Sequence, residues 1–256
     1  MRIIFSRKGF DSAAGGGASP IIDGRPVSLP IPSGGYSRTS YADLGLGDAA
    51  RGASRGKVGA DDLCHHDPMF LSEGTCLFGQ CGAAQTHLAN QGVTIGDVFL
   101  FFGLFREEAT GEPHHRIFGY QRIARIVPMG GCEAEALGEF ITLGHPHALG
   151  MHAGNDVIYV GDGRTAARAR PELRLTVDGG PPSLWNRPAW MQPQSLSYHA
   201  DPARWLPGKR LRSVSRGQEF VCEIGKRPIP RRWLEHTIAL IWDEAVETRD
   251  VLHSSD

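Results

Sequence analysis

The sequence predicts an α+β protein built around a β-barrel or a strongly curved β-sheet, with an irregular N-terminal elaboration and a C-terminal helix. Many short apolar segments alternate with turn residues, and 33 glycines and 17 prolines in 256 residues favour short strands over long helices. A helical pattern of useful length occurs near the C-terminus. Strands and helices do not alternate, which disfavours a doubly wound parallel sheet. We expect a single domain over residues 1–256.

The expected elements of the first half centre on one hairpin. Residues 3–6 form a short strand, and residues 9–62 lack periodicity and are expected to be loop, hairpin or irregular structure. Residues 82–91 (GAAQTHLANQ) are expected to form a short helix. The apolar run at residues 96–105 (GDVFLFFGLF) indicates a buried strand.

The hairpin partner of this buried strand is residues 116–127 (RIFGYQRIARIV). Its isoleucines do not keep one alternation, which predicts a bulge near Gly119. Further strands are expected at residues 156–160 (DVIYV), 173–177 (LRLTV) and 218–223 (QEFVCE). Residues 229–242 form an amphipathic helix, with its apolar side expected at Trp233, Ile238, Ile241 and Trp242.

Composition limits the function classes. The net charge of −1 excludes a global positive field, so any nucleic-acid surface must be a local patch. Five cysteines without C-x-x-C spacing argue against a disulfide framework or a zinc knuckle and favour a reducing cytoplasm. No apolar window reaches membrane-spanning length. We therefore expect a cytoplasmic protein with no membrane association.

The end of the first strand is a candidate anion site. Arg7, Lys8 and Gly9 offer positive charge and backbone N–H groups, and Asp11 and Ser12 add polar groups nearby. Neither a P-loop motif nor a dinucleotide fingerprint follows, so nucleotide hydrolysis by that route is excluded. The alternative is an ordinary first strand followed by a flexible loop.

A second polar group surrounds the start of the expected helix at residues 82–91. Gln80 and Gln85 each carry a donor and an acceptor, as reading a base edge requires, and His87 lies beside them. Helix capping and simple exposure explain them equally well. Cys81 stands where a helix N-terminus would lower a thiol pKa, but a small packing residue is the favoured interpretation.

Histidines cluster at three places, namely His65-His66-Asp67, His114-His115, and His145-Pro146-His147 with His152. Such groups can hold a transition metal, yet their spacing matches no standard zinc signature. The sequence therefore predicts no bound metal and no cofactor. If a metal were found, the ligands to test would be His65, Asp67, His145 and His147.

Two resemblances carry these observations further. The hairpin GDVFLFFGLF…RIFGYQRIARIV resembles the core of PUA-like domains, notably the EVE and ASCH groups, which are small curved barrels. This resemblance implies a PUA-like core around residues 96–177 and recognition of RNA or modified bases in a pocket beside the hairpin.

A longer series of motifs runs along nearly the whole chain: IIFSRKGFDSAAGG, SLPIP, TSYADL, CHHDP, FGQCGAAQTHL, GDVFLFFGLFR, HPH, DVIYV, SLWNRPAWM and RGQEFV. Together they resemble the nucleotide modification associated domain, third type. Genome context places this family near DNA-modification and restriction systems. The resemblance implies nucleotide-binding residues at Ser6, Arg7, Lys8, Asp11, Ser12, His65, Asp67, Gln80, Gln85 and His87. The stretch CHHDPM departs from the expected HLDPD at His66 and Met69, which removes a second acid from any metal site there.

The expected function is binding of a nucleotide or modified nucleobase, free or within nucleic acid, in a DNA-modification or restriction context. The alternative is an enzyme that modifies a nucleotide or base, with His65, Asp67 or His87 as acid–base groups or metal ligands. We expect one shared pocket containing Lys8, Asp67, Gln80, Gln85 and His87.

Overall fold

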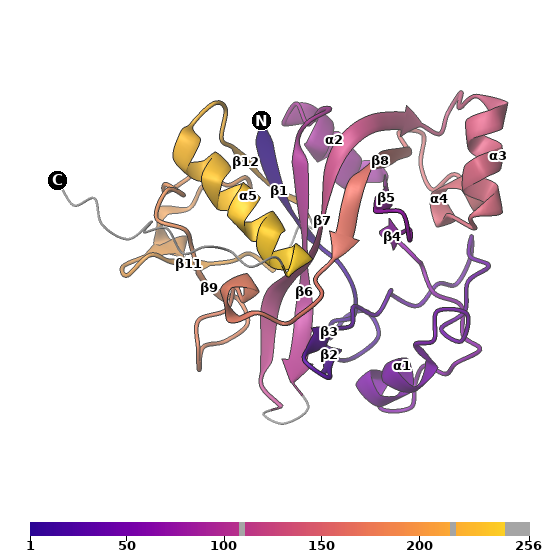
Figure 1. The fold of residues 1–256 in the computed structure, drawn as a ribbon, viewed down its shortest axis with the longest axis horizontal. Coiled ribbons are helices and arrows are strands. Elements are labelled where there is room, and N and C mark those ends of the chain that lie inside the picture. Colours follow the sequence, from indigo (N-terminus) through magenta and orange to yellow (C-terminus); the bar gives the residue numbers. More distant parts are fainter. Residues whose placement is uncertain (108–110, 216–218, 244–256) are drawn as a thin grey trace.

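The computed structural model of the protein describes residues 1–107, 111–215 and 219–243 (Figure 1). The strands are β1 (Arg2–Arg7), β2 (Ser19–Ile22), β3 (Arg25–Pro26), β4 (Met69–Phe70), β5 (Thr75–Gln80), β6 (Val98–Glu107), β7 (Pro113–Pro128), β8 (Val157–Thr165), β9 (Leu184–Asn186), β10 (Trp205–Leu206), β11 (Arg210–Arg212) and β12 (Glu219–Glu223). The helices are α1 (Gly47–Ser54), α2 (Gly82–Asn90), α3 (Ala134–Thr142), α4 (Pro146–Leu149) and α5 (Pro228–Trp242), with short 3-10 turns η1 (Pro171–Leu173) and η2 (Pro202–Arg204).

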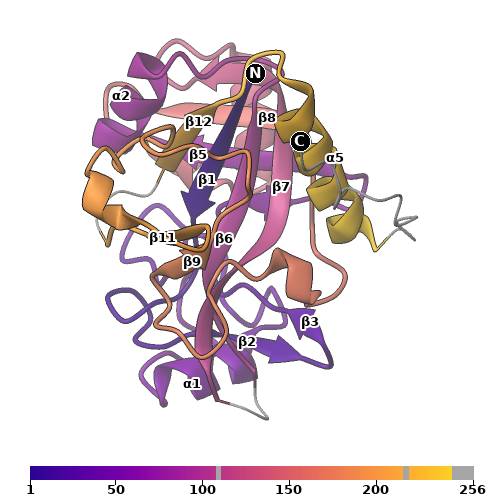
Figure 2. The same cartoon turned by 90° about the vertical axis from the view of Figure 1, so that its left-hand side faces the viewer.

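The main sheet is nine-stranded among the described residues and strongly curled into a half-barrel (Figures 1 and 2). Its strand order is β12-β1-β6-β7-β8-β5-β4, and β2 pairs with the far end of β6. Strands β1 and β2 run parallel to β6, and the other neighbouring pairs are antiparallel. The predictions of an α+β fold, a curved sheet and a C-terminal helix are therefore confirmed, and the β6–β7 hairpin is central as expected.

Strand β6 is buried on both faces, which explains its unbroken apolar run. Leu100 and Phe102 face a core that includes Phe5 of β1 and apolar residues of α5. Phe99 and Phe101 face the opposite core, inside the curl. The sheet is thus the middle layer of the molecule, and the curled inner face has its own aromatic core.

Two bulges in β7 contribute to the curl. The β6–β7 register shifts between Phe101 and Phe102, which leaves Phe118 as the extra residue beside Gly119. The bulge predicted near Gly119 is therefore confirmed. A second shift against β8 occurs between Ile123 and Arg125. Bulges bend a strand and increase its twist, so they help the sheet to turn toward itself.

Helix α5 covers the outer face of the sheet in Figure 1. Its buried apolar residues include Leu234, Ile238 and Ile241. Trp242, expected on the buried side, is 42 % exposed at the helix end. There its indole N–H donates to the Tyr120 hydroxyl, and the Arg164 guanidinium stacks over its ring.

Three features of the local structure differ from the expectations. The segment 9–62 includes an expected hairpin, formed by β2 and β3, but it also contains helix α1, which buries Ala50 against Phe10 and Tyr41. Helix α3 was not expected. Residues 173–177 do not form a strand, since η1 ends at Leu173 and the following residues make only isolated bridges.

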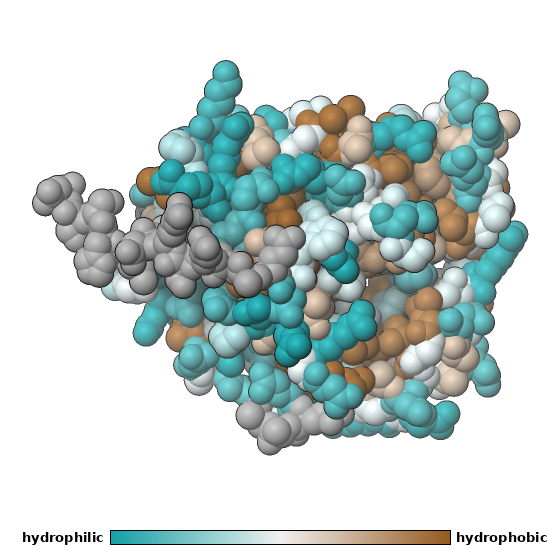
Figure 3. Space-filling model, viewed as in Figure 1, coloured by the Kyte–Doolittle hydropathy of each residue, from teal (hydrophilic) through white to brown (hydrophobic). Residues whose placement is uncertain are grey.

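All five cysteines are free thiols. In the part of the chain that the structure describes, no helix has the length and hydropathy needed to cross a membrane. Hydrophilic residues cover much of the face in Figure 3, which is recessed between the surface over α1 and the surface over α3 and α4.

The second bulge gives a stability prediction. A Cβ at Gly161 of β8 would lie 1.9 Å from the Arg122 carbonyl oxygen, so Gly161→Ala must displace backbone. We expect it to lower the free energy of unfolding by about 1–3 kcal/mol, measured by urea denaturation. Gly138→Ala in α3 is the control, because its Cβ meets no atom within 4 Å. It should be neutral or stabilising, and equal effects of the two changes would contradict the prediction.

Candidate functional site

The inner face of the curled sheet changes from apolar to polar at one end. Side chains alternate across a strand, so Ile4 of β1 and Phe78 of β5 share the inner core. By the same alternation, Lys8, just after β1, and Gln80, the last residue of β5, also lie on the inner side of the sheet. Glu219 begins β12 and lies opposite Ser6 in the β1–β12 register. Four polar groups therefore meet where these strands end, namely those of Ser6, Lys8, Gln80 and Glu219.

Glu219 joins these strands. Its Oε1 accepts from Lys8 Nζ at 3.1 Å and from Gln80 Nε2 at 2.7 Å. The Glu219 side chain is only 1 % exposed, and no group in the described ranges hydrogen-bonds its Oε2. Lys8 Nζ also lies 4.3 Å from the centroid of the Phe78 ring. Most of the charge on Lys8 is thus balanced inside the protein.

A cavity of about 470 Å³ opens at this polar end. Its lining includes Lys8, His65, Asp67, Gln80, Cys81 and His147. A neighbouring cavity of about 420 Å³ shares Lys8 and Asp67 with it. The two hollows therefore meet between the end of β1 and the segment that precedes β4.

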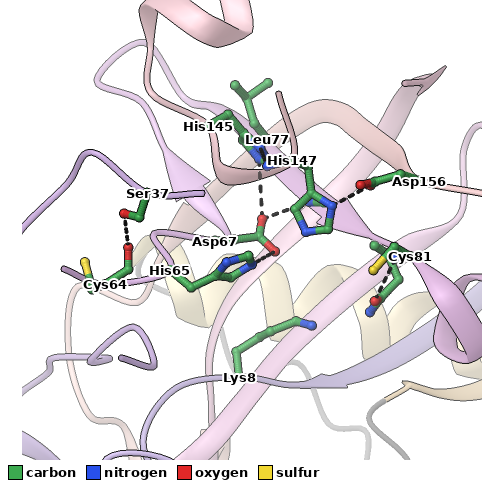
Figure 4. Close-up of polar contacts among 12 residues, drawn as sticks. Lys8, Ser37, Cys64, His65, Asp67, Leu77, Cys81, His145, His147 and Asp156 are labelled. Atoms are coloured by element: carbon green, nitrogen blue, oxygen red, sulfur yellow. Dashed lines mark hydrogen bonds and ion pairs between the residues drawn. The ribbon is translucent and has the colours of Figure 1, made fainter. Parts of the chain in front are cut away.

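One wall of the cavity is a cluster of imidazoles and carboxylates (Figure 4). His65 and Asp67 lie in the segment before β4, with His65 Nε2 3.9 Å from Asp67 Oδ2. His147, on α4, lies with its ring centroid 5.4 Å from that of His65. In Figure 4 these three side chains turn toward one another, and the Lys8 side chain extends toward the same space.

Neighbouring groups fix the orientation of the cluster. Asp67 Oδ1 accepts from the Gly79 backbone N–H at 2.8 Å and lies 3.5 Å from His145 Nε2. His147 Nδ1 lies 2.5 Å from Asp156 Oδ1. A Cβ on Gly79 would lie 2.1 Å from the His147 ring, so only glycine leaves room for this imidazole.

The protonation states follow from burial and these contacts. Burial lowers the pKa of His65 to about 4, and the nearby His147, His152 and Lys8 also lower it, although Asp67 opposes them. Burial alone would raise the pKa of Asp67, but its contact with His145 and the adjacent imidazoles hold this pKa well below its usual range. Near neutral pH the cavity therefore presents a neutral His65 beside an ionised Asp67.

Cys81 does not have the activated thiol that a helix N-terminus can produce. Burial raises the pKa of its thiol, and the nearby Asp156 and Asp67 raise it further, although Lys8 opposes them. Gly79 and Gly82 lie on either side of it in sequence, followed by two alanines, as expected for packing. The structure thus gives no support for a thiolate nucleophile at Cys81.

The candidate residues at and after the end of the first strand differ in their partners and their burial. The Arg7 guanidinium lines the cavity but donates to the carbonyl oxygens of Val214 and Ser215. Asp11 also lines the cavity, where its carboxylate accepts from the N–H groups of Ala13 and Ala14 in a local turn. Ser6 is buried, and Ser12 is exposed.

The structure does not bring the whole expected set to one pocket. Lys8, Asp67 and Gln80 line the cavity with His65, but Gln85 and His87 are not among its lining residues. Gln85 accepts from the Tyr159 hydroxyl at 2.9 Å. His87 Nε2 lies 2.9 Å from the Ser197 hydroxyl, with its ring beside that of Tyr198. The regular turn of α2 points these side chains toward other parts of the protein.

Several residues of the site were not in the predicted binding set. These are His145, His147, Asp156 and Glu219. The motif HPH at residues 145–147 was a signal, because proline-flanked histidines were already candidate ligands. Asp156 immediately precedes β8 and Glu219 begins β12. Both acids are buried, although charged side chains are rarely buried unless they are paired, so neither had a signal in the sequence.

The lowered pKa of His65 predicts a pH effect on stability. Because this pKa is near 4 in the folded protein and near 6.5 otherwise, the unfolded chain binds a proton more readily. The contribution of His65 to the free energy of unfolding is fully present above about pH 6.5 and is lost as the pH falls toward 4. Over this pH range the free energy of unfolding of His65→Gln should fall by up to about 3 kcal/mol less than that of the wild type. Urea denaturation of both proteins in EDTA measures this difference. Identical pH profiles for the two proteins would contradict this.

Comparison with known proteins identifies the family of the chain. Residues 2–223 match the family described as nucleotide modification associated domain 3. No curated protein and no solved structure gives a significant match. Since the match includes the cavity-lining segments and most of the chain, this protein belongs to the nucleotide modification associated domain 3 family.

Proposed function

We propose that the protein binds a nucleotide or modified nucleobase in the cavity at the polar end of the curled sheet, in a DNA-modification or restriction context. The observation that carries this is the cavity itself, whose volume of about 470 Å³ suits a small polar ligand. Lys8 contributes a cation, and His65 contributes a neutral ring that can stack on a base or share a hydrogen bond. Family membership supports a role connected with nucleotide modification.

The charge around the cavity favours a ligand with few negative charges. Asp67, Asp156 and Glu219 are carboxylates with side chains no more than 4 % exposed. Lys8 is already paired with one of them. These carboxylates would repel the negative charges of a triphosphate at close range. The proposed ligand is therefore a nucleobase, a nucleoside or a nucleoside monophosphate.

Gln80 is not free to read a base edge in this arrangement. Its amide N–H₂ donates to Glu219, and its Oε1 accepts from the Cys81 backbone N–H at 3.0 Å. Its role in the proposed site is to hold Glu219, and through it Lys8, at the cavity wall. Selectivity for the ligand would then come from the imidazoles and from backbone groups of the lining.

An enzyme that modifies the bound nucleotide is the second candidate, and the pair His65–Asp67 favours it. A neutral imidazole next to an ionised carboxylate can accept a proton from a ligand group in the cavity. His87 takes no part in this version, because it contacts Ser197 outside the lining. The same residues would then both bind the nucleotide and move a proton.

Calorimetry with modified and unmodified nucleobases, nucleosides and nucleoside monophosphates tests the binding proposal, with and without EDTA. Lys8→Met should weaken binding of a monophosphate at least about tenfold, because it removes the cation at the cavity wall. Lys57→Met, at an exposed lysine, is the matched control and should leave affinity unchanged.

Mass spectrometry of the same mixtures then distinguishes binding from chemistry. Binding with every ligand recovered unchanged supports the binding function, and a new product supports the enzyme. Failure of all these ligands to bind under both conditions, or equal affinities for Lys8→Met and wild type, would overturn the proposal. Circular dichroism of each variant checks that the fold is retained.

A further inference from the structure

We infer that His65, Asp67 and His147 form a binding site for one divalent transition-metal ion, with open coordination positions that face the cavity. One ligand atom from each residue can be chosen so that all lie within 4.8 Å of one another. Two imidazoles and one carboxylate are a donor set suited to zinc, iron, cobalt or manganese. This inference does not depend on which molecule fills the cavity.

The hydrogen bonds around His147 leave its Nε2 free to bind a metal ion. The Asp156 carboxylate accepts from His147 Nδ1 at 2.5 Å, which directs the lone pair of His147 to Nε2. A carboxylate behind a ligating histidine is the usual outer partner in metal sites. Asp156 Oδ2 is itself fixed by the His152 backbone N–H at 2.9 Å.

Asp67 is oriented in the same way. Its Oδ1 accepts from the Gly79 N–H and lies 3.5 Å from His145 Nε2. His145 Nδ1 accepts from the His147 backbone N–H, so the His145 proton lies on the nitrogen that faces Asp67. Oδ2 of Asp67 is thereby left toward His65.

The separation of the donor atoms fits an ion better than a direct contact. His65 Nε2 and Asp67 Oδ2 are 3.9 Å apart, which is too long for a hydrogen bond. Adjacent ligands of one ion with bonds of about 2.0–2.2 Å lie roughly 3.0–3.5 Å apart. Small side-chain rotations would therefore close the cluster around an ion.

The local charge points to a cation as well. The side chains of Asp67, Asp156 and Glu219 are no more than 4 % exposed, and Lys8 is the cation that pairs with Glu219. A divalent ion between His65 and His147 would balance the remaining carboxylates. The three ligands were already candidates in the sequence, but they come from the segment before β4 and from α4, so their spacing matches no standard metal signature.

Three protein ligands leave room for further ones. Structural zinc sites are usually closed by four protein side chains, whereas catalytic sites keep a position for water or substrate. His65, Asp67 and His147 line the cavity, so the remaining positions of an ion would face the space where a nucleotide is proposed to bind. The inferred site is therefore of the open type.

Cobalt(II) titration of protein purified without a histidine tag and treated with EDTA tests the inference. We expect visible absorption that saturates at one ion per chain, is displaced by zinc, and is accompanied by a rise in Tm. His65→Ala should weaken cobalt binding at least about tenfold. The His65 ring makes no hydrogen bond within the described residues, so this variant should fold. Asp67→Asn should weaken binding similarly.

His236→Ala is the matched control, because His236 is an exposed histidine on α5. It should bind cobalt as the wild type does. Absence of stoichiometric binding to the wild type would overturn the inference, as would equal affinities for wild type and folded His65→Ala. These outcomes are separate from the nucleotide titrations in EDTA, so failure of the metal site and failure of the nucleotide site can be told apart.

Discussion

The buried carboxylate of Glu219 is the constraint on which the site depends. Its Oε1 accepts from both Lys8 Nζ and Gln80 Nε2, and so it connects the start of β12 with the ends of β1 and β5. In the sheet order, β5 lies five positions from β12, and direct contact between their side chains requires the sheet to curl. Removing one member of such a buried group leaves an uncompensated charge, which costs far more than an exposed ion pair contributes.

The curl explains why one end of the sheet is suited to a ligand. Inside the half-barrel, Phe78, Phe99 and Phe101 fill the middle with aromatic rings. At the end of the same face, Lys8, Gln80 and Glu219 replace them with charged and amide groups. The cluster of His65, Asp67 and His147 faces this end from outside the strands. The polar groups therefore line the cavity, while the aromatic residues pack in the core behind them.

The sequence predicted those features that depend on local pattern. The apolar run of β6, the α5 helix and the bulge beside Gly119 each follow from neighbouring residues. Helix α1 was missed because it is only eight residues long, contains two glycines and lies in a stretch rich in turn residues. Long-range contacts had no local signal: His147 reaches His65 only through the packing of α4, and Gln85 turns toward Tyr159 because of the phase of α2. The convergence of Lys8, His65, Asp67 and Gln80 could be proposed from strand ends, but Glu219 and Asp156 required the fold.

The most direct test of this account is a double-mutant cycle at the centre of the site. Lys8→Met, Glu219→Gln and the double variant would be compared with the wild type by urea denaturation. Because Lys8 and Glu219 are 12 % and 1 % exposed and lie 3.1 Å apart, their changes should be strongly coupled. The account predicts a coupling energy of about 1–3 kcal/mol. Additive effects within about 0.5 kcal/mol would show that Glu219 does not hold the strand ends together.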